Sequence, residues 1–182
     1  MAYAVQATKR LKQFFVEIGE LSDFAMRFFK EVLKPPYEFK ELLRQCYNMG
    51  NRSLVLVGVT GFIIGLVLTL QSRPTLIEFG AVSWMPNMVG ISIVREIGPV
   101  ITALICAGRI ASGIGAELGS MRVTEQIDAM EVSGTNPFKY LVVTRIAATT
   151  LMLPLLVIFG DMVALYGSAL VENIKGNVSF QL

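Results

Sequence analysis

One stretch, Ser53–Ser72, limits the folds open to this chain more than any other feature. Its sequence, SLVLVGVTGFIIGLVLTLQS, contains no charged side chain. As an α-helix it would be about 30 Å long, which is enough to cross the hydrocarbon core of a membrane. Composition agrees, because 53% of the 182 residues are hydrophobic and only 16% are charged, a balance outside the usual range of soluble domains. We therefore expect an all-α, polytopic helical membrane protein.

A second span is predicted at Asn87–Ala116. It is less uniform than the first, because Arg95 and Glu96 lie inside it and Pro99 follows them. Charge within a membrane span usually faces a cavity or another helix, and proline usually kinks a helix. The pair is therefore either a functional site or a structural ion pair with another helix.

A third span is predicted at Phe138–Leu170. Asn136 is suited to cap its start, and Pro137 is suited to the first helical position. Asp161 is a single acid within this apolar run, and Glu172 and Lys175 are expected to mark the exit from the span. The chain thus predicts three transmembrane helices.

The N-terminal region, residues 1–52, is expected to be amphipathic and to precede the transmembrane region, residues 53–182. Apolar side chains recur there at helical spacing and predict an interfacial helix that the Pro35–Pro36 pair ends; they are Phe14, Ile18, Leu21, Ala25, Phe28 and Val32. A second short amphipathic piece is predicted at Tyr37–Asn48. Nine of the sixteen Lys and Arg residues precede the first span, which favours a cytoplasmic N-terminus.

Small residues in the spans predict close helix packing. Gly61 and Gly65 form a GxxxG pair in the first span, although glycines merely tolerated in an apolar span would give the same pattern. The second span ends in two parallel rows of small residues, which could pack against this chain or a second copy. The candidates for this packing are Gly108, Ala111, Ser112, Gly115, Ala116 and Gly119.

The segment Glu117–Pro137, hereafter the polar segment, has the sequence ELGSMRVTEQIDAMEVSGTNP. It is too polar for the lipid core, so we expect a loop in water that contains a short helix, Thr124–Ser133. Thr124 is its predicted N-cap and Gly134 its predicted stop. A helix this short is marginal alone. It could rest on its own membrane domain or dock on a partner, and the residues alone leave both open.

Several classes of site are not indicated by the sequence. The chain has no histidine, its cysteines Cys46 and Cys106 have no CxxC spacing, and it lacks a phosphate-binding loop and a Rossmann glycine signature. We therefore expect no metal site, no catalytic residue and no cofactor in this chain, and no nucleic-acid partner. If ATP is used, another subunit must bind it.

The run from Arg95 to Pro137, REIGPVITALICAGRIASGIGAELGSMRVTEQIDAMEVSGTNP, resembles the signature region of the MlaE (YrbE) family of ABC-transporter permeases. The resemblance extends to LPLL at Leu153–Leu156 and to the LQS that ends the first span, and it covers most of the chain from Ser53. It implies a multi-pass homodimeric permease of a bacterial inner membrane that moves phospholipids between the inner and outer membranes. The implied partners are a cytoplasmic ATPase dimer that binds ATP and Mg²⁺, a periplasmic MCE-domain lipid-binding protein and often a STAS-domain subunit. Family permeases have five spans, so this chain is expected to be a fragment.

The resemblance also implies roles for particular residues. EQIDAM, Glu125–Met130, matches the coupling helix that docks on the ATPase, and Glu96 matches a charged position near the lipid cavity. The candidate coupling residues are Glu117, Arg122, Glu125, Gln126, Ile127, Asp128 and Met130. The other candidate residues of the lipid cavity are chosen from their positions along the spans and not from the resemblance. The full set is Leu68, Leu70, Phe79, Met88, Arg95 and Glu96.

Two alternative functions are compatible with the residues. A non-transporting scaffold would use the small-residue faces only for assembly. An ion-coupled carrier would use Asp161 and Glu96 as proton sites. Dependence of lipid movement on ATP, on a proton gradient or on neither would separate the three.

Overall fold

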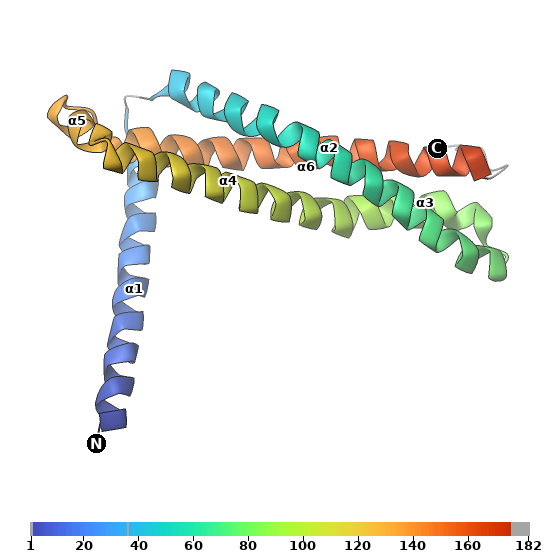
Figure 1. The fold of residues 1–182 in the computed structure, drawn as a ribbon, viewed down its shortest axis with the longest axis horizontal. Helices are drawn as coiled ribbons and strands as arrows, with labels where there is room; N and C mark the ends of the chain where they lie inside the picture. Colours follow the sequence, from blue (N-terminus) through green and yellow to red (C-terminus); the bar gives the residue numbers. More distant parts are fainter. Residues whose placement is uncertain (1, 36, 176–182) are drawn as a thin grey trace.

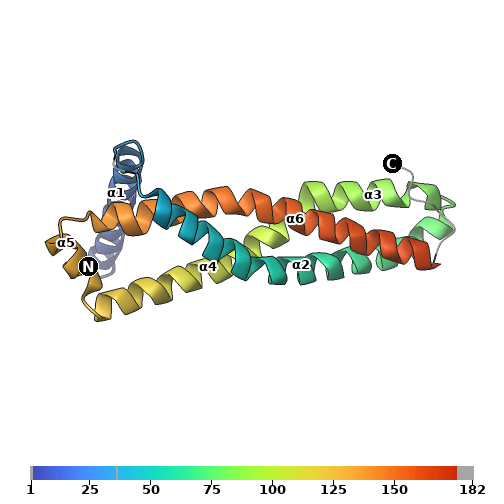
Figure 2. The ribbon, with the colours of Figure 1, turned by 90° about the horizontal axis from the view of Figure 1, so that it is seen from above.

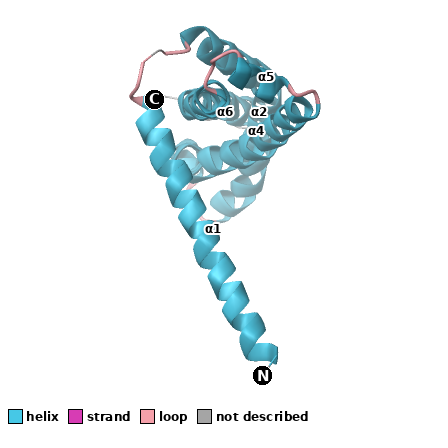
Figure 3. Ribbon diagram, turned by 90° about the vertical axis from the view of Figure 1, so that its left-hand side faces the viewer, coloured by secondary structure: helices cyan, strands magenta, loops and turns pink. Residues whose placement is uncertain are grey.

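The computed structural model describes residues 2–35 and 37–175, and this part of the chain contains helices and no strand (Figure 3). Three helices are long and apolar enough to cross a membrane: Phe39–Glu78, Val82–Val123 and Phe138–Ile174. The prediction of a polytopic helical membrane protein with three spans is confirmed. The elements are α1 (Ala2–Val32), α2 (Phe39–Glu78), the short η1 (Val82–Trp84), α3 (Met85–Ser92), the π-helical η2 (Ile93–Ile97), α4 (Gly98–Val123), α5 (Gln126–Val132), the π-helical η3 (Phe138–Val143) and α6 (Thr144–Lys175).

The three spans lie lengthwise beside one another and alternate in direction (Figures 1 and 2). At one end, here called the hairpin end, α2 turns into α3 through Gly80, whose φ of 65° is the left-handed conformation that glycine adopts readily. At the opposite end, the α5 end, α4 passes into α5 and then into α6. The polar segment and the hairpin therefore lie at opposite ends of the bundle.

The first span is longer than predicted. α2 continues for 40 residues, about 60 Å of helix, so the piece predicted at Tyr37–Asn48 is the beginning of α2 and not a separate element. The helix also continues past Arg73 and Pro74, which follow the uncharged run, because Pro74 lies inside α2. Pro74 removes only one backbone hydrogen bond and lies near the helix end, where few bonds remain to be lost.

The tightest packing in the bundle joins α2 to α6. A Cβ atom added to Gly61 would lie 2.8 Å from the carbonyl oxygen of Gly160, and one added to Gly65 would overlap the carbonyl oxygen of Ala164. Farther along, the Thr69 hydroxyl donates a buried 2.7 Å hydrogen bond to the Ser168 hydroxyl. The two glycines of the GxxxG pair therefore permit close backbone approach within this chain.

The N-terminal helix α1 projects away from the α5 end and crosses the direction of the spans (Figures 1 and 3). Its contact with the bundle is at η3, where Phe24 meets the Phe138 ring with centroids 5.2 Å apart and the Arg27 guanidinium lies 4.4 Å from that ring centroid. A helix that crosses the spans is oriented as an interfacial helix must be, but its place in the interface stays a prediction. Pro36, predicted to help end this helix, lies outside the described residues, and α1 ends at Val32.

The second span differs from prediction at both ends. It begins with η1 and α3, and α4 then continues past Ala116 to Val123, so the first third of the polar segment is helix and not loop. The only weak helix former in that extension is Gly119, and one glycine costs only about 1 kcal/mol in a helix. Between α3 and α4, Arg95 and Glu96 lie in the π-helical turn Ile93–Ile97, an irregularity common at functional sites.

Candidate functional site

The short helix of the polar segment is α5, Gln126–Val132. The predicted start at Thr124 is wrong. Thr124 ends α4 instead, and its hydroxyl donates a 2.8 Å hydrogen bond to the Ser120 carbonyl oxygen. Glu125 precedes α5 with a φ of 56°, in the left-handed region. The turn between α4 and α5 therefore depends on the left-handed conformation of Glu125. We had expected a side-chain cap at the start of α5, and none is formed there.

The predicted end of this helix is confirmed. Gly134 has a φ of 75°, and the Thr135 amide donates a 3.0 Å hydrogen bond to the Met130 carbonyl oxygen. The Gly134 amide donates a 3.0 Å hydrogen bond to the Glu131 carbonyl oxygen, and the two bonds together form a Schellman motif. The predicted Asn136 cap is also confirmed, because its side-chain oxygen accepts a 3.1 Å hydrogen bond from the Phe138 amide.

Only part of α5 is packed on its own chain. Asp128 forms a 2.8 Å ion pair with Arg122 of α4, and both side chains are largely exposed. Ile127 and Met130 are half-buried, whereas Val132 at the end of α5 is 90% exposed. Glu125, Gln126, Asp128 and Glu131 are exposed too. The helix therefore presents an acidic surface with apolar residues beside it.

An ion pair between a buried arginine and a half-exposed glutamate joins α4 to α6. The Arg145 side chain is 4% exposed, and its Nη2 lies 2.9 Å from Oε2 of the half-exposed Glu117. Its Nη1 donates to the Leu141 carbonyl oxygen. Arg145 of α6 thus binds Glu117, the first acid of the polar segment. Sequence reasoning missed this because Arg145 is 28 positions away from Glu117 and only the return of the chain brings them together.

Replacement of Glu117 by alanine is expected to lower the stability of the helical domain by about 2 kcal/mol, since it leaves the buried Arg145 without its carboxylate. The cost is below that of breaking a fully buried pair because Glu117 is half in solvent. Thermal unfolding in detergent, followed by circular dichroism, measures it. The control is Glu131→Ala, which removes an exposed acid of α5 and is expected to change little; equal shifts for both would contradict the assigned role of the ion pair.

A second candidate site lies at the hairpin end. A pocket of about 380 Å³ opens between α2 and α3. Leu68 and Met88, both predicted to line a lipid cavity, are among its lining residues. The other predicted cavity residues, Leu70, Phe79, Arg95 and Glu96, lie outside it with exposed side chains. The remaining lining residues are Gln71, Ser72, Thr75, Leu76, Val89, Ser92 and Ile97.

Two acids are buried in α6. Asp161 is 9% exposed and lies against Gly98, immediately after the π-helical turn. Glu172 is only 1% exposed, although it lies near the end of α6, which the structure places at Lys175. Arg73, near the end of α2, is an opposite charge that acts on Glu172, but both carboxylate oxygens of Glu172 are buried without a hydrogen bond in the described part of the chain.

The small-residue face of α4 has no neighbour in the described part of the chain. A Cβ atom added at Gly108, Gly115 or Gly119 would meet nothing within 4 Å there. The other candidates of this face, Ala111, Ser112 and Ala116, are exposed as well. The packing predicted for these residues is therefore not satisfied by α2 or α6.

Three apolar spans, with a short acidic helix at one end and a pocket between helices at the other, define the class of a multi-pass helical membrane protein. Residues 42–182 match the family of the permease MlaE. The chain belongs to this permease family, as the resemblance of Arg95–Pro137 predicted.

Individual relatives agree with this assignment. A probable ABC transporter permease protein of Rickettsia felis is 39% identical over 92% of this chain and 64% of its own length. A probable ABC transporter permease protein of Synechocystis is 35% identical over 80% of this chain and 55% of its own length. The intermembrane phospholipid transport system permease protein MlaE of Haemophilus influenzae is 34% identical over 90% of this chain and 62% of its own length. The chain thus spans less than two thirds of the length of these relatives.

Proposed function

We propose that this chain belongs to the permease subunit of an ABC transporter that moves phospholipids between the inner and outer membranes of a bacterium. In this proposal a separate cytoplasmic ATPase supplies the energy, and the chain itself is not an enzyme. The support comes from the family, from the relative in Haemophilus influenzae whose name specifies intermembrane phospholipid transport, and from the geometry of α5.

The observation that carries the proposal is the surface of α5. This helix stands at the end of the bundle (Figure 2) and exposes Val132 beside three acids, Glu125, Asp128 and Glu131. Docking surfaces commonly have an apolar centre with a polar rim, and on α5 the exposed Val132 and the half-buried Ile127 and Met130 lie beside the acids. A helix of seven residues that is only half packed on its own chain is also short of stabilising contacts. We infer that the ATPase docks here and that the coupling residues lie on α5 and the end of α4.

The fold offers a mechanical path from this surface to the membrane. α4 is one continuous helix of 26 residues, about 39 Å long, and its far end is the π-helical turn that contains Arg95 and Glu96. Movement of α5 by the ATPase would displace α4, to which Arg122 joins it. The ATPase would thereby favour one of two arrangements of the bundle, since ligands act by binding one state better than the other.

The unpartnered face of α4 supports the proposed homodimer. Small residues allow helix backbones to approach closely in a membrane, and in the described part of the chain nothing covers this face. A second copy of the permease, or further spans of the longer relatives, would satisfy it. A periplasmic MCE-domain protein and a STAS-domain subunit complete the proposed assembly, in which the N-terminus lies in the cytoplasm of a bacterial inner membrane.

The proposal is tested by reconstituting the intact permease with its ATPase in liposomes and measuring transfer of a fluorescent phospholipid to acceptor vesicles. Transfer should require hydrolysable ATP. Transfer driven by a proton gradient without ATP would replace the proposal with the ion-coupled carrier, and transfer under neither condition would favour the scaffold.

The pocket at the hairpin end is proposed to hold phospholipid. A photoreactive amino acid at Met88 should capture co-purified phospholipid, whereas one at Ile63 should capture several-fold less once bulk lipid has been exchanged for detergent. The two positions are matched, because Met88 is 54% exposed and Ile63 is 50% exposed, but only Met88 lines the pocket. Mass spectrometry of the crosslinked protein gives the ratio, and equal capture would argue against a lipid site here.

A further inference from the structure

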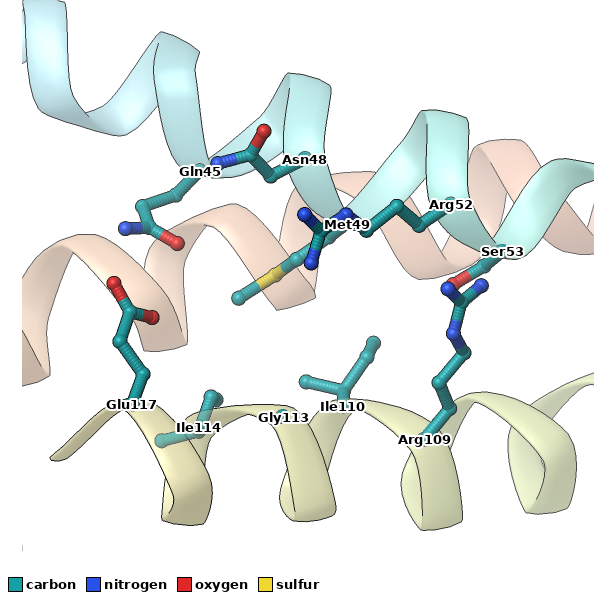
Figure 4. Close-up of a pocket in the computed structure, with 10 residues that line it drawn as sticks. All are labelled: Gln45, Asn48, Met49, Arg52, Ser53, Arg109, Ile110, Gly113, Ile114 and Glu117. Atoms are coloured by element: carbon teal, nitrogen blue, oxygen red, sulfur yellow. The ribbon is translucent and has the colours of Figure 1, made fainter. Parts of the chain in front are cut away.

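A second pocket, of about 360 Å³, lies between α2 and α4 (Figure 4). Its α4 residues, from Arg109 to Glu117, lie toward the end of α4 that leads to α5. Its volume is in the range of small-molecule sites. Two arginines reach into it from different helices, Arg52 from α2 and Arg109 from α4. The other lining residues are Gln45, Asn48, Met49, Ser53, Ile110, Gly113, Ile114 and Glu117.

The charges of this pocket are unbalanced. Within the described part of the chain, no hydrogen bond or ion pair joins the guanidinium of Arg52 or Arg109 to an acid. Glu117 is the only acid among the lining residues, and its carboxylate is held by Arg145 at 2.9 Å. Two positive charges thus face a shared space without a carboxylate of their own, which favours an anionic ligand.

The position of the pocket along the spans selects the kind of anion. Arg52 immediately precedes Ser53–Ser72, the uncharged run long enough to cross the hydrocarbon core, so we expect its guanidinium at the depth of the lipid headgroups. Met49, Ile110 and Ile114 give the same pocket an apolar side. A site with guanidinium groups at headgroup depth and apolar walls matches an amphipathic ligand better than a free ion.

We propose that Arg52 and Arg109 bind the phosphodiester headgroup of a phospholipid in the membrane leaflet at the α5 end. Guanidinium groups match the geometry of phosphate oxygens and donate charge-assisted hydrogen bonds to them. Met49, Ile110 and Ile114 contact the glycerol and the first acyl carbons. The site lies at the opposite end of α2 from the pocket lined by Leu68 and Met88, so it adds a second lipid position to the proposed function and does not depend on transport.

The test uses the intact permease in non-ionic detergent with a photoreactive amino acid in place of Ile114, which reports on this pocket alone. The probe is dioctanoyl phosphatidylglycerol, and capture is measured against its concentration. Arg52→Gln and Arg109→Gln should each raise the half-saturating concentration about tenfold, the effect of losing a hydrogen bond to a charged group. Arg44→Gln is the matched control, since Arg44 is an exposed arginine of α2 outside this pocket, and it should leave capture unchanged.

A variant that keeps both arginines tests whether loss of capture could come from misfolding of the arginine variants. Gly113 lies in the pocket with nothing within 4 Å of an added Cβ, so Gly113→Leu should fold normally, fill the space and abolish capture. The proposal would be overturned if the wild type did not capture the lipid. It would also be overturned if the wild type did so and neither the arginine variants nor Gly113→Leu reduced capture.

Two further probes separate the sources of the anion. Dioctanoylglycerol, which lacks the phosphate, should not be captured. Inorganic phosphate should compete only at much higher concentrations than the lipid; competition at equal concentrations would identify a site for a soluble anion and would refute the lipid assignment. Lipid capture at this pocket needs neither ATP nor an ATPase. Absence of capture would therefore refute this site without contradicting the proposed transport function. Loss of transport with normal capture would contradict the transport function but not this site.

Discussion

Gly65→Ala is expected to lower the stability of the helical domain by about 3 kcal/mol, the upper range for inserting one methyl group into a packed interface. The added Cβ would overlap the carbonyl oxygen of Ala164 in α6, and a backbone atom cannot move aside without separating the two helices. α2 and α6 would have to part along their most extensive interface. Denaturation in detergent, followed by circular dichroism, measures the loss.

Gly113→Ala is the matched control for this change. Both glycines lie inside α-helices, and alanine is up to about 1 kcal/mol more favourable than glycine there. Gly113 has open space around an added Cβ, so its variant should be as stable as the wild type or slightly more stable. Gly61→Ala, whose added Cβ would lie 2.8 Å from the Gly160 carbonyl oxygen, should fall between them. Equal stabilities across the series would show that the α2–α6 contact is looser than described.

Reversal of two charges on the coupling surface, Glu125→Lys with Asp128→Lys, is expected to abolish co-purification of the ATPase with the permease. The double variant changes the charge of an exposed surface by four units, and like charges at an interface cost several kcal/mol. The membrane fold should survive, because the Arg122–Asp128 ion pair is exposed and such pairs contribute at most about 1 kcal/mol.

The control for this double variant is Glu17→Lys with Glu20→Lys, which makes the same charge change on exposed positions of α1. Co-purification should persist with this control, and circular dichroism should be unchanged for both proteins. If the ATPase still co-purifies with the variant of Glu125 and Asp128, α5 is not the docking element.

The membrane spans and the helix ends at Gly134 and Asn136 could be predicted because they depend on local chemistry. An uncharged run of twenty residues can only be stable in lipid as a helix, and glycine at Gly134 and asparagine at Asn136 act on backbone groups within a few residues. The polar segment does lie at one end of the bundle, but its first third continues α4 as helix. Its short helix was placed two residues too early because Thr124 can cap either the end of one helix or the start of the next.

The contacts that shape the candidate sites join residues far apart in sequence. The pairing of Glu117 with Arg145, the burial of Glu172 near Arg73 and the meeting of Arg52 with Arg109 all depend on how three antiparallel helices are rotated about their axes. Hydropathy gives the length and existence of each helix but does not determine which face meets which neighbour. Leu68 and Met88 were predicted from position and line one pocket, whereas Leu70 and Phe79, predicted in the same way, point elsewhere.

The sequence by itself determined that this protein is a helical membrane protein with three spans in this chain, and its signature region determined the permease family. Lipid leaves a backbone almost no alternative to the helix, so composition is sufficient for that conclusion. Only the tertiary structure decided that Gly61 and Gly65 pack on α6, that the small-residue face of α4 is left open in the described chain, and that two arginines share a pocket. These outcomes depend on side-chain shape and helix rotation across the bundle, because packing energies are summed over distant neighbours that no local pattern specifies.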